Sequence, residues 1–427
     1  MPTIVSSIAA VLFLVAGVPI ALALLVIPLA FLVLDPSLTT PMLVIPQKMF
    51  AAMDSFPLMA VPFFVLVGQV MNSGGITTRI FEFANSLVGH FRGGLAQVNI
   101  IASLLMSGMS GSAVADASGL GQVEIKVMTD EGYDPGLAAA VTAASATVGP
   151  IIPPSIPLVI VGAVTNTSIS QLLVAGLLPG LLMTVALCSL VAWIARRNNL
   201  PTRPRATLHH LFMSFARSAP ALFAPVLLVG GILAGVFTPT EASAVAAAYA
   251  ILIAMFWYRE MDMFGLFRVL WTSAMTVGAI FFIIAAAATV SWLLTWLGVP
   301  QRLAGELGNL TGNPVILMLM IIGFLLVVGC FLESNAAIIL VAPLLVPIAV
   351  NAGFDPVHIG TVIVLTLMLG LVTPPVGMNM FIVMSIARIS LRHYLRAIWP
   401  FFIVLMVATL TVAFVPWISL VVPRTLL

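Results

Sequence analysis

Long apolar segments separated by short polar loops follow one another along almost the whole chain. A helix of about 20 apolar residues crosses the hydrocarbon core of a bilayer, so this pattern predicts many membrane-spanning helices. The first apolar segment fills most of residues 1–34 and has no Lys or Arg before it. Because a signal peptide has a basic start and a shorter apolar core, we expect this segment to remain as a helix.

The chain repeats itself at an interval of 221 residues. The segment GYDP…GPIIPPS at 132–155 is matched by GFDP…GLVTPPVG at 353–377. Within them Gly132, Asp134, Pro135, Gly149, Pro153 and Pro154 correspond to Gly353, Asp355, Pro356, Gly370, Pro374 and Pro375. Upstream, Gly75, Ile76, Arg79 and Gly89 correspond to Gly298, Val299, Arg302 and Gly312. So many matches in order indicate two copies of one unit, 1–195 and 218–427, joined by a basic cytoplasmic linker at 196–217.

The distribution of basic residues indicates that the two copies have opposite orientations in the membrane. The loop at 165–168 has no Lys or Arg, whereas its counterpart after the second copy holds Arg388, Arg392 and Arg396. Basic loops stay on the cytoplasmic side, so these two loops lie on opposite faces. The other basic residues stay consistent with this: Arg79, Arg92, Arg196, Arg197, Arg203, Arg205, Arg217, Arg259 and Arg268 fall inside, Lys48, Arg302 and Arg424 fall outside, and Lys126 lies near a hairpin end. Inverted repeats are typical of secondary transporters.

Each copy contains a pair of apolar segments that are too short to cross the membrane. These segments are 94–109 and 113–128 in the first copy, and 314–329 and 335–350 in the second. A spanning helix needs about 20 residues, so each pair predicts a re-entrant hairpin, at about 94–128 and about 314–350. The tips of these hairpins are expected at 108–112 and 330–334.

Each hairpin is followed by an apolar segment, 136–163 or 357–385, with a proline pair in its middle. Proline breaks a helix, so each segment predicts two half-helices around an unwound centre. Unwound backbone inside a membrane is tolerated only where its polar groups find partners. Free carbonyls with nearby hydroxyl oxygens suit a hard cation, and half-helix N-termini suit an anion. Because neutral oxygens dominate, we expect sodium at the tips and centres.

Polar residues at the tips and breaks are the candidate ligands. Ser110 and Ser112 lie in a glycine-flanked tip, and Glu333 and Asn335 lie at the second tip, with Glu333 aligned to Ser112. Gly149, Gly370 and Thr373 are candidates from their position at the breaks. For substrate binding or coupling, the candidates are Asp116, Ser155, Glu241 and Asn379. A carboxylate in an apolar segment, such as Asp116, is costly and usually functional, as ion-site support or as a brace of the hairpin. Glu241 has an equally good interpretation as a first-turn acid at a helix N-terminus.

The composition excludes several classes of protein. Hydrophobic residues make up 62% of the chain and charged residues 7%, and the mean hydropathy is +1.22. A soluble protein carries about a quarter charged residues, so a cytosolic enzyme or a nucleic-acid binder is excluded. Cys188 and Cys330 form neither a disulfide framework nor a metal motif, so we expect no cofactor beyond sodium as the coupling ion.

These motifs together resemble the large membrane subunit of tripartite ATP-independent periplasmic (TRAP) transporters over nearly the whole chain. The resemblance rests on GMSGSAVADASGLG (108–121), GPIIPPS (149–155), FTPTEAS (237–243), FLESNAAIILVAPLLVPIA (331–349) and GLVTPPVGMNMF (370–381). It implies an all-α polytopic protein of the bacterial inner membrane, with two inverted repeats, that takes up an organic acid with sodium by an elevator motion. It also implies a separate small four-helix membrane subunit and a soluble periplasmic binding protein. Sialic acid is the favoured substrate, with a C4-dicarboxylate as the second candidate.

The family's cation sites use the two hairpin tips and the adjoining breaks, which this resemblance carries over to Ser110, Ser112, Asp116, Glu333 and Asn335. Many members of the family have Asp where Glu333 stands, so the carboxylate is kept but its reach differs. Two alternatives remain open at this stage. A standalone sodium–dicarboxylate symporter or sodium/proton antiporter would share the hairpin architecture. An intramembrane enzyme is not favoured, because the sequence has no HExxH or GxGD motif.

Overall fold

The computed structural model describes residues 18–34, 42–73, 75–198, 200–299 and 313–427, and within these ranges it contains helices and turns but no strand. Among them, eight helices are long and apolar enough to cross a membrane. The predicted all-α polytopic class is therefore confirmed. The predictions made for residues 1–17, Arg302 and Gly312 lie outside the described residues.

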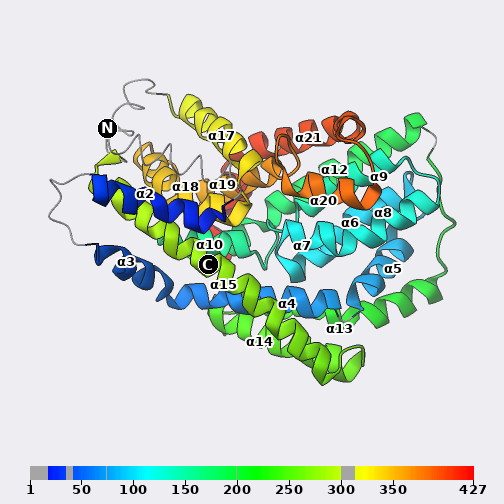
Figure 1. The fold of residues 1–427 in the computed structure, drawn as a ribbon. Coiled ribbons are helices and arrows are strands. Elements are labelled where there is room, and N and C mark those ends of the chain that lie inside the picture. The colour runs from blue at the N-terminus through cyan, green and yellow to red at the C-terminus, as the bar shows by residue number, and fades with distance from the viewer. Residues whose placement is uncertain (1–17, 35–41, 74, 199, 300–312) are drawn as a thin grey trace.

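One group of helices, which we call the scaffold group, runs along one side of the molecule (Figure 1). Its members are α2 (Ile20–Leu34), α3 (Val44–Met53), η1 (Phe56–Met59), α4 (Ala60–Ser73), α5 (Ile76–Val88), α13 (Leu208–Leu233), α14 (Pro239–Leu252), η2 (Ile253–Trp257) and α15 (Met263–Trp296). The long helix α15 packs on α2, α3 and α4, and α14 packs on α4 and α13. These helices come from both copies of the repeat.

The remaining helices form a second group, the core group, which contains the predicted hairpins and broken helices. From the first copy come α6 (Gly94–Ser110), α7 (Ala113–Ser118), α8 (Leu120–Asp130), α9 (Pro135–Ala146), α10 (Ile156–Thr165), α11 (Ile169–Ala175) and α12 (Leu177–Asn198). From the second come α17 (Pro314–Phe331), α18 (Ser334–Asn351), α19 (Pro356–Gly370), α20 (Met378–Ala387), α21 (Leu391–Phe414) and α22 (Trp417–Leu426). The hairpins α6–α8 and α17–α18 approach the centre from opposite sides (Figure 1). The half-helix α10 packs on α18, and α20 packs on α7 and α8, so the copies interlock.

Matched residues of the two copies make the same local structure. Asp134 accepts a hydrogen bond from the backbone N–H of Leu137 at 2.9 Å and begins α9, with Pro135 at the first helical position. Asp355 likewise accepts from the N–H of Val357 at 2.9 Å and begins α19. An N-cap carboxylate followed by proline is a strong helix start, because the proline needs no hydrogen-bond acceptor there. The sequence repeat is thus also a repeat of structure.

The hairpin helices differ in length from the prediction. Helices α17 and α18 have 18 residues each, so they reach the lower limit for a spanning helix, although they meet at a tip. The second arm of the first hairpin is divided at Gly119 into α7 and α8, which the apolar pattern did not indicate. The predicted linker at 196–217 is mostly helical: α12 continues to Asn198, and α13 begins after Thr207. Arg196 and Arg197 extend α12 because cations stabilise a helix C-terminus.

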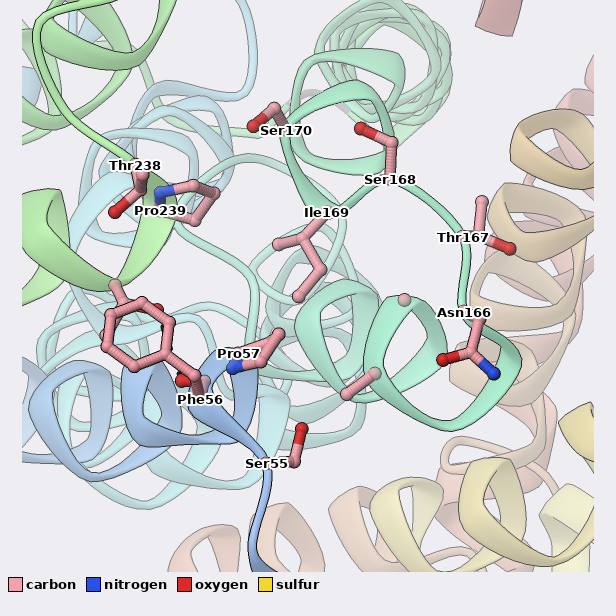
Figure 2. A pocket seen from close by; sticks show the side chains of 13 residues that line it. Ser55, Phe56, Pro57, Asn166, Thr167, Ser168, Ile169, Ser170, Thr238 and Pro239 are labelled. Atoms are coloured by element: carbon pink, nitrogen blue, oxygen red, sulfur yellow. Dashed lines mark hydrogen bonds between the residues drawn. The ribbon is translucent and has the colours of Figure 1, made fainter.

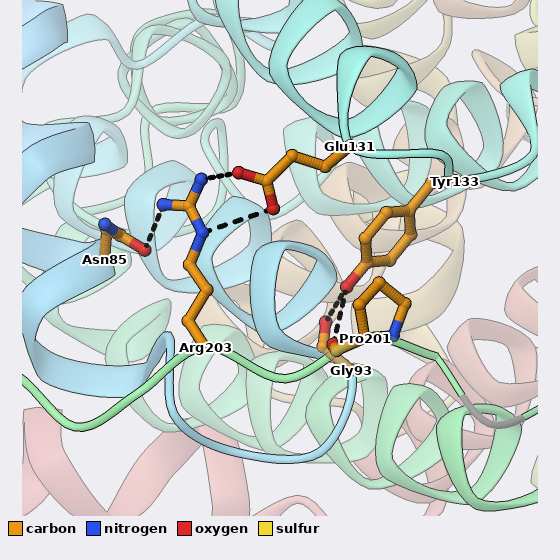
Figure 3. Close-up of polar contacts among 6 residues, drawn as sticks. All are labelled: Asn85, Gly93, Glu131, Tyr133, Pro201 and Arg203. Atoms are coloured by element: carbon orange, nitrogen blue, oxygen red, sulfur yellow. Dashed lines mark hydrogen bonds and ion pairs between the residues drawn. The ribbon is translucent and has the colours of Figure 1, made fainter.

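The short linker is attached to both groups of helices (Figure 3). Arg203 forms an ion pair with Glu131 at the end of α8 and donates a hydrogen bond to the Oδ1 of Asn85 in α5 at 3.0 Å. The Tyr133 hydroxyl lies 3.1 Å from the carbonyl oxygen of Gly93 and 3.3 Å from that of the linker residue Pro201. The ion pair of Arg203 with Glu131 and the contact of Pro201 with Tyr133 hold the linker against the base of the first hairpin.

Candidate cation and substrate site

The tip of the first hairpin lies directly against the break between α9 and α10. Gly111 has a positive φ of 58°, and a Cβ atom there would lie 2.6 Å from the carbonyl oxygen of Pro154. Only glycine allows both this backbone conformation and this close approach. Ser112 follows as the N-cap of α7 and accepts a hydrogen bond from the N–H of Ala115 at 3.4 Å.

Asp116 faces the same break from the first turns of α7. Its side chain is 2% exposed, and neither oxygen has a hydrogen-bond partner of normal geometry among the described residues. A Cβ atom at Gly149 would lie 2.4 Å from the Oδ2 of Asp116, and the Ser110 hydroxyl lies beside the same carboxylate. The structure therefore brings together three residues that the sequence suggested separately. A buried carboxylate without a partner favours a cation nearby, so this arrangement fits sodium.

The second tip lies against the second break in a similar way. A Cβ atom at Gly370 would lie 2.5 Å from the Cα of Gly329, so the two backbones are in direct contact. The Cys330 sulfur is 2.9 Å from the Thr373 hydroxyl, which also donates to the Gly370 carbonyl at 2.9 Å. The Cys330 carbonyl accepts from the N–H of Val376 at 3.2 Å. Hydroxyl and carbonyl oxygens are thus gathered here, which suits a hard cation.

Glu333 is held by its own helix. It is the N-cap of α18, and its Oε2 accepts from the N–H of Ala336 at 3.1 Å. Its Oε1 accepts from the hydroxyl of Ser334 and from the side-chain amide of Asn335, both at 3.0 Å. The Oδ1 of Asn335 is buried and has no partner in the described part of the chain. The amide oxygen of Asn335 is therefore the group at this tip that lacks a partner.

The two tips meet at one cavity of about 390 Å³. Ser110 and Ser112 line it from the first tip, and Glu333 and Asn335 from the second. Side chains of α4 and α15 in the scaffold group form the facing wall: Val65, Gln69, Thr276, Ala279, Ile280 and Ile283. Helices α7, α10, α18 and α20 all begin at or beside this cavity, and no Lys or Arg is among its described lining residues. Helix N-termini carry partial positive charge, so the cavity suits an anionic ligand.

Comparisons with known proteins agree with this architecture. A family model described as "Tripartite ATP-independent periplasmic transporter, DctM component" matches residues 7–418. The chain belongs to this family. It is 42% identical over 412 residues to the sialic acid TRAP transporter large permease protein SiaM of Vibrio cholerae, covering 96% of each chain. It is 37% identical to the C4-dicarboxylate TRAP transporter large permease protein DctM of Pseudomonas aeruginosa, covering 89% of each.

The permease is thus a multi-pass protein of the bacterial inner membrane and not an enzyme. A solved structure of the YdaH transporter of Alcanivorax borkumensis, described as having an unusual topology, has a related fold. Its TM-score is 0.61 at 15% identity, with 89% of this chain and 88% of that chain covered. At this identity the likeness concerns the fold alone.

Three further sequence candidates have other positions in the permease. Ser155 is the N-cap of α10, where it accepts from the N–H of Leu158 at 3.1 Å and donates to the Pro150 carbonyl. Glu241 completes a capping box with Thr238 at the start of α14, and it does not line the cavity between the tips. The capping interpretation of Glu241 therefore accounts for its contacts. Asn379 is fully buried, and its amide has no partner among the described residues.

Glu124 in α8 is a buried acid that the sequence reasoning overlooked. Its side chain is 1% exposed, and its Oε1 has no hydrogen-bond partner in the described part of the permease. The signal that singled out Asp116, an acid within an apolar hairpin, applies equally to Glu124. A polar cluster that includes Asn99 and Thr142 lies between the neighbouring helices α6 and α9.

A second cavity, of about 490 Å³, lies at the boundary of the two groups of helices (Figure 2). The scaffold group contributes Ser55, Phe56, Pro57, Thr238, Pro239 and Thr240. The core group contributes the loop between α10 and α11, which includes Asn166, Thr167 and Ser168. Because both groups line this cavity, its shape depends on their relative position.

Proposed function

We propose that the permease is the sodium-coupled transport subunit of a TRAP system that imports an organic acid delivered by a periplasmic binding protein. The observation that carries this proposal is the cavity at which both hairpin tips meet. Sialic acid is the favoured substrate, because of the 42% identity to a sialic acid permease over 96% of both chains. A C4-dicarboxylate is the second candidate, since a relative named for that substrate is 37% identical.

Sodium and substrate would bind side by side in this arrangement. The proposed sodium ligands at the first tip and break are Ser110, Ser112 and Gly149; at the second they are Glu333, Asn335, Gly370 and Thr373. Sodium at a tip favours the closed tip, because the oxygens it binds come from both the tip and the adjacent break. The bound ions and the helix N-termini would then supply the positive charge for the acid, in a cavity that has no Lys or Arg among its described lining. Binding of either ligand therefore strengthens binding of the other.

The transport step would be an elevator motion of the core group against the scaffold group. The cavity between the tips has one wall from each group, so sliding one group past the other would expose it to the opposite side of the membrane. A Cβ atom at Gly68 of α4 would lie 3.2 Å from the Ser110 carbonyl oxygen. A larger side chain at position 68 would therefore press against the tip of the first hairpin. The boundary cavity of Figure 2 would change shape during the same motion.

Two partners are part of the proposal. The relatives are named as large permeases of TRAP systems, which supports a separate small membrane subunit and a soluble binding protein. Helix α13 exposes large apolar side chains, among them Phe212, Phe215, Phe223 and Val226. In a membrane these face lipid or the small subunit.

Uptake by proteoliposomes tests the proposal. Labelled sialic acid or succinate is supplied with every combination of the permease, the small subunit and the binding protein, with and without an inward sodium gradient. We expect uptake of sialic acid only when all three proteins and the gradient are present. Uptake by the permease alone would favour the standalone symporter, and uptake without sodium would refute the coupling.

A further inference from the structure

A buried polar cluster lies between α6, the first arm of the first hairpin, and α9, away from the hairpin tip. Asn99 of α6 donates a hydrogen bond to the Thr142 hydroxyl of α9 at 2.7 Å and accepts one from the Ser145 hydroxyl at 2.8 Å. Ser103 of α6 donates to the Ser145 hydroxyl at 3.0 Å. All four side chains are 2% exposed or less. The cluster therefore places amide and hydroxyl oxygens in an interior that is otherwise apolar.

Glu124 lies on the face of α8 that is turned toward this cluster. A Cβ atom at Gly121 would lie 2.8 Å from the Cγ2 of Thr142, and the Asn99 amide is 3.8 Å from the sulfur of Met128. Residues three or four apart share a helix face, so Glu124, between Gly121 and Met128, belongs to the same face. Its carboxylate is thus directed to the interface of α8 with α6 and α9.

The charge of Glu124 has no protein counterpart there. Helices α6, α7, α9 and α20, which make most of the contacts with α8, contain no Lys, Arg or His; α5, which touches α8 less, has Arg79, and that residue forms an ion pair with Glu260. Asp116 of α7 is an acid, which repels Glu124 and does not balance it. On α8 itself, Lys126 and Asp130 are exposed. A carboxyl group that is 1% exposed, with an oxygen that has no partner in the described residues, is costly unless a cation or a proton neutralises it.

The second copy shows that the hairpin does not need these polar residues for its architecture. The residues that lie 221 positions after Glu124 and Thr142 are Leu345 and Ile363, which are both apolar. Their helices α18 and α19 nevertheless pack against each other, as α8 and α9 do. A buried acid costs stability in such a position, so its presence in one copy only indicates a separate task.

We propose that Glu124, with Asn99 and Thr142, binds a sodium ion between the first hairpin and α9, in addition to the ions at the tips. One carboxylate among neutral amide and hydroxyl oxygens is balanced by one monovalent cation, and these are hard oxygen ligands. The ion cancels the charge of Glu124, so the hairpin carries no uncompensated charge from this residue when it moves. The site goes beyond the proposed transport function, which needs only the ions at the tips.

Binding of ²²Na⁺ to the purified full-length permease in nanodiscs tests this site without any transport measurement. We expect Glu124→Gln to lower the saturating amount of bound sodium by one ion per chain. Glu124→Asp and Thr142→Val should keep that ion but bind it at least severalfold more weakly. The matched control is Asp130→Asn, which neutralises an exposed acid at the end of the same helix and should bind as the unmodified permease does.

Several results would overturn the proposal. One is an unchanged amount and affinity of bound sodium in Glu124→Gln. Another is carbodiimide labelling of Glu124 that is equally fast in sodium and potassium, which would assign a proton to this position. A loss of all bound sodium together with a lower unfolding temperature in sodium-free buffer would show that Glu124 braces the hairpin instead. Loss of one ion in Glu124→Gln, with the remaining sodium ions still bound, would support this site independently of the ions at the tips.

Discussion

Gly370→Ala should weaken sodium binding at the second tip. The added Cβ would lie 2.4 Å from the carbonyl carbon and 2.5 Å from the Cα of Gly329, and neither backbone atom can turn aside. Overpacking of this kind costs about 1–3 kcal/mol, and separating the tip from the break relieves it. Because sodium binds the assembled tip and break, that energy appears as weaker sodium binding, about 5- to 150-fold.

The assay is sodium-dependent uptake by proteoliposomes that contain all three components, with the sodium concentration for half-maximal uptake as the readout. The matched control is Gly323→Ala in α17 of the same hairpin, where no described heavy atom lies within 4 Å of the added Cβ. Alanine is a better helix former than glycine by about 0.8–1.0 kcal/mol, so this control should fold at least as well and keep its sodium dependence. If Gly370→Ala expresses well and has unchanged sodium dependence, the contact between tip and break does not form a sodium site.

Three other predictions concern single residues. Asn335→Ala removes the unpartnered amide oxygen at the second tip, and we expect it to raise the sodium concentration for half-maximal uptake severalfold at unchanged expression; unchanged sodium dependence would exclude it as a ligand. Sodium, but not potassium, should slow thiol labelling of Cys330 in a Cys188→Ala background, because the sulfur lies at the contact between tip and break; equally fast labelling in both salts would show a tip that stays open. Glu131→Gln breaks the exposed pair with Arg203 and should cost at most about 1 kcal/mol, seen as a lower unfolding temperature in low salt that disappears in 1 M salt.

Local chemistry along the sequence determined which segments are helices and where they break. The proline pairs interrupt both long apolar segments wherever they are placed, since a proline cannot donate a backbone hydrogen bond. Asp134 and Asp355 cap the helices that follow them for an equally local reason. The repeat of 221 residues, which needs no structure to be seen, then implied that every element of one copy has a counterpart in the other. What the apolar pattern could not show was the division of the arm at Gly119, since hydrophobicity alone does not mark where one helix ends and the next begins.

Only the tertiary structure decided which polar side chains lie together. Nothing in the spacing between Asp116 and Gly149 indicates that the carboxylate faces that break, because the contact depends on how α7 packs against α9. Glu241 and Glu124 are both acids next to apolar runs, yet one is an exposed helix cap and the other is buried beside a polar cluster. Burial and partners depend on segments that are distant in the sequence. The meeting of Ser112 and Glu333 at one cavity likewise follows from the interlocking of the two copies, which a one-dimensional pattern does not contain.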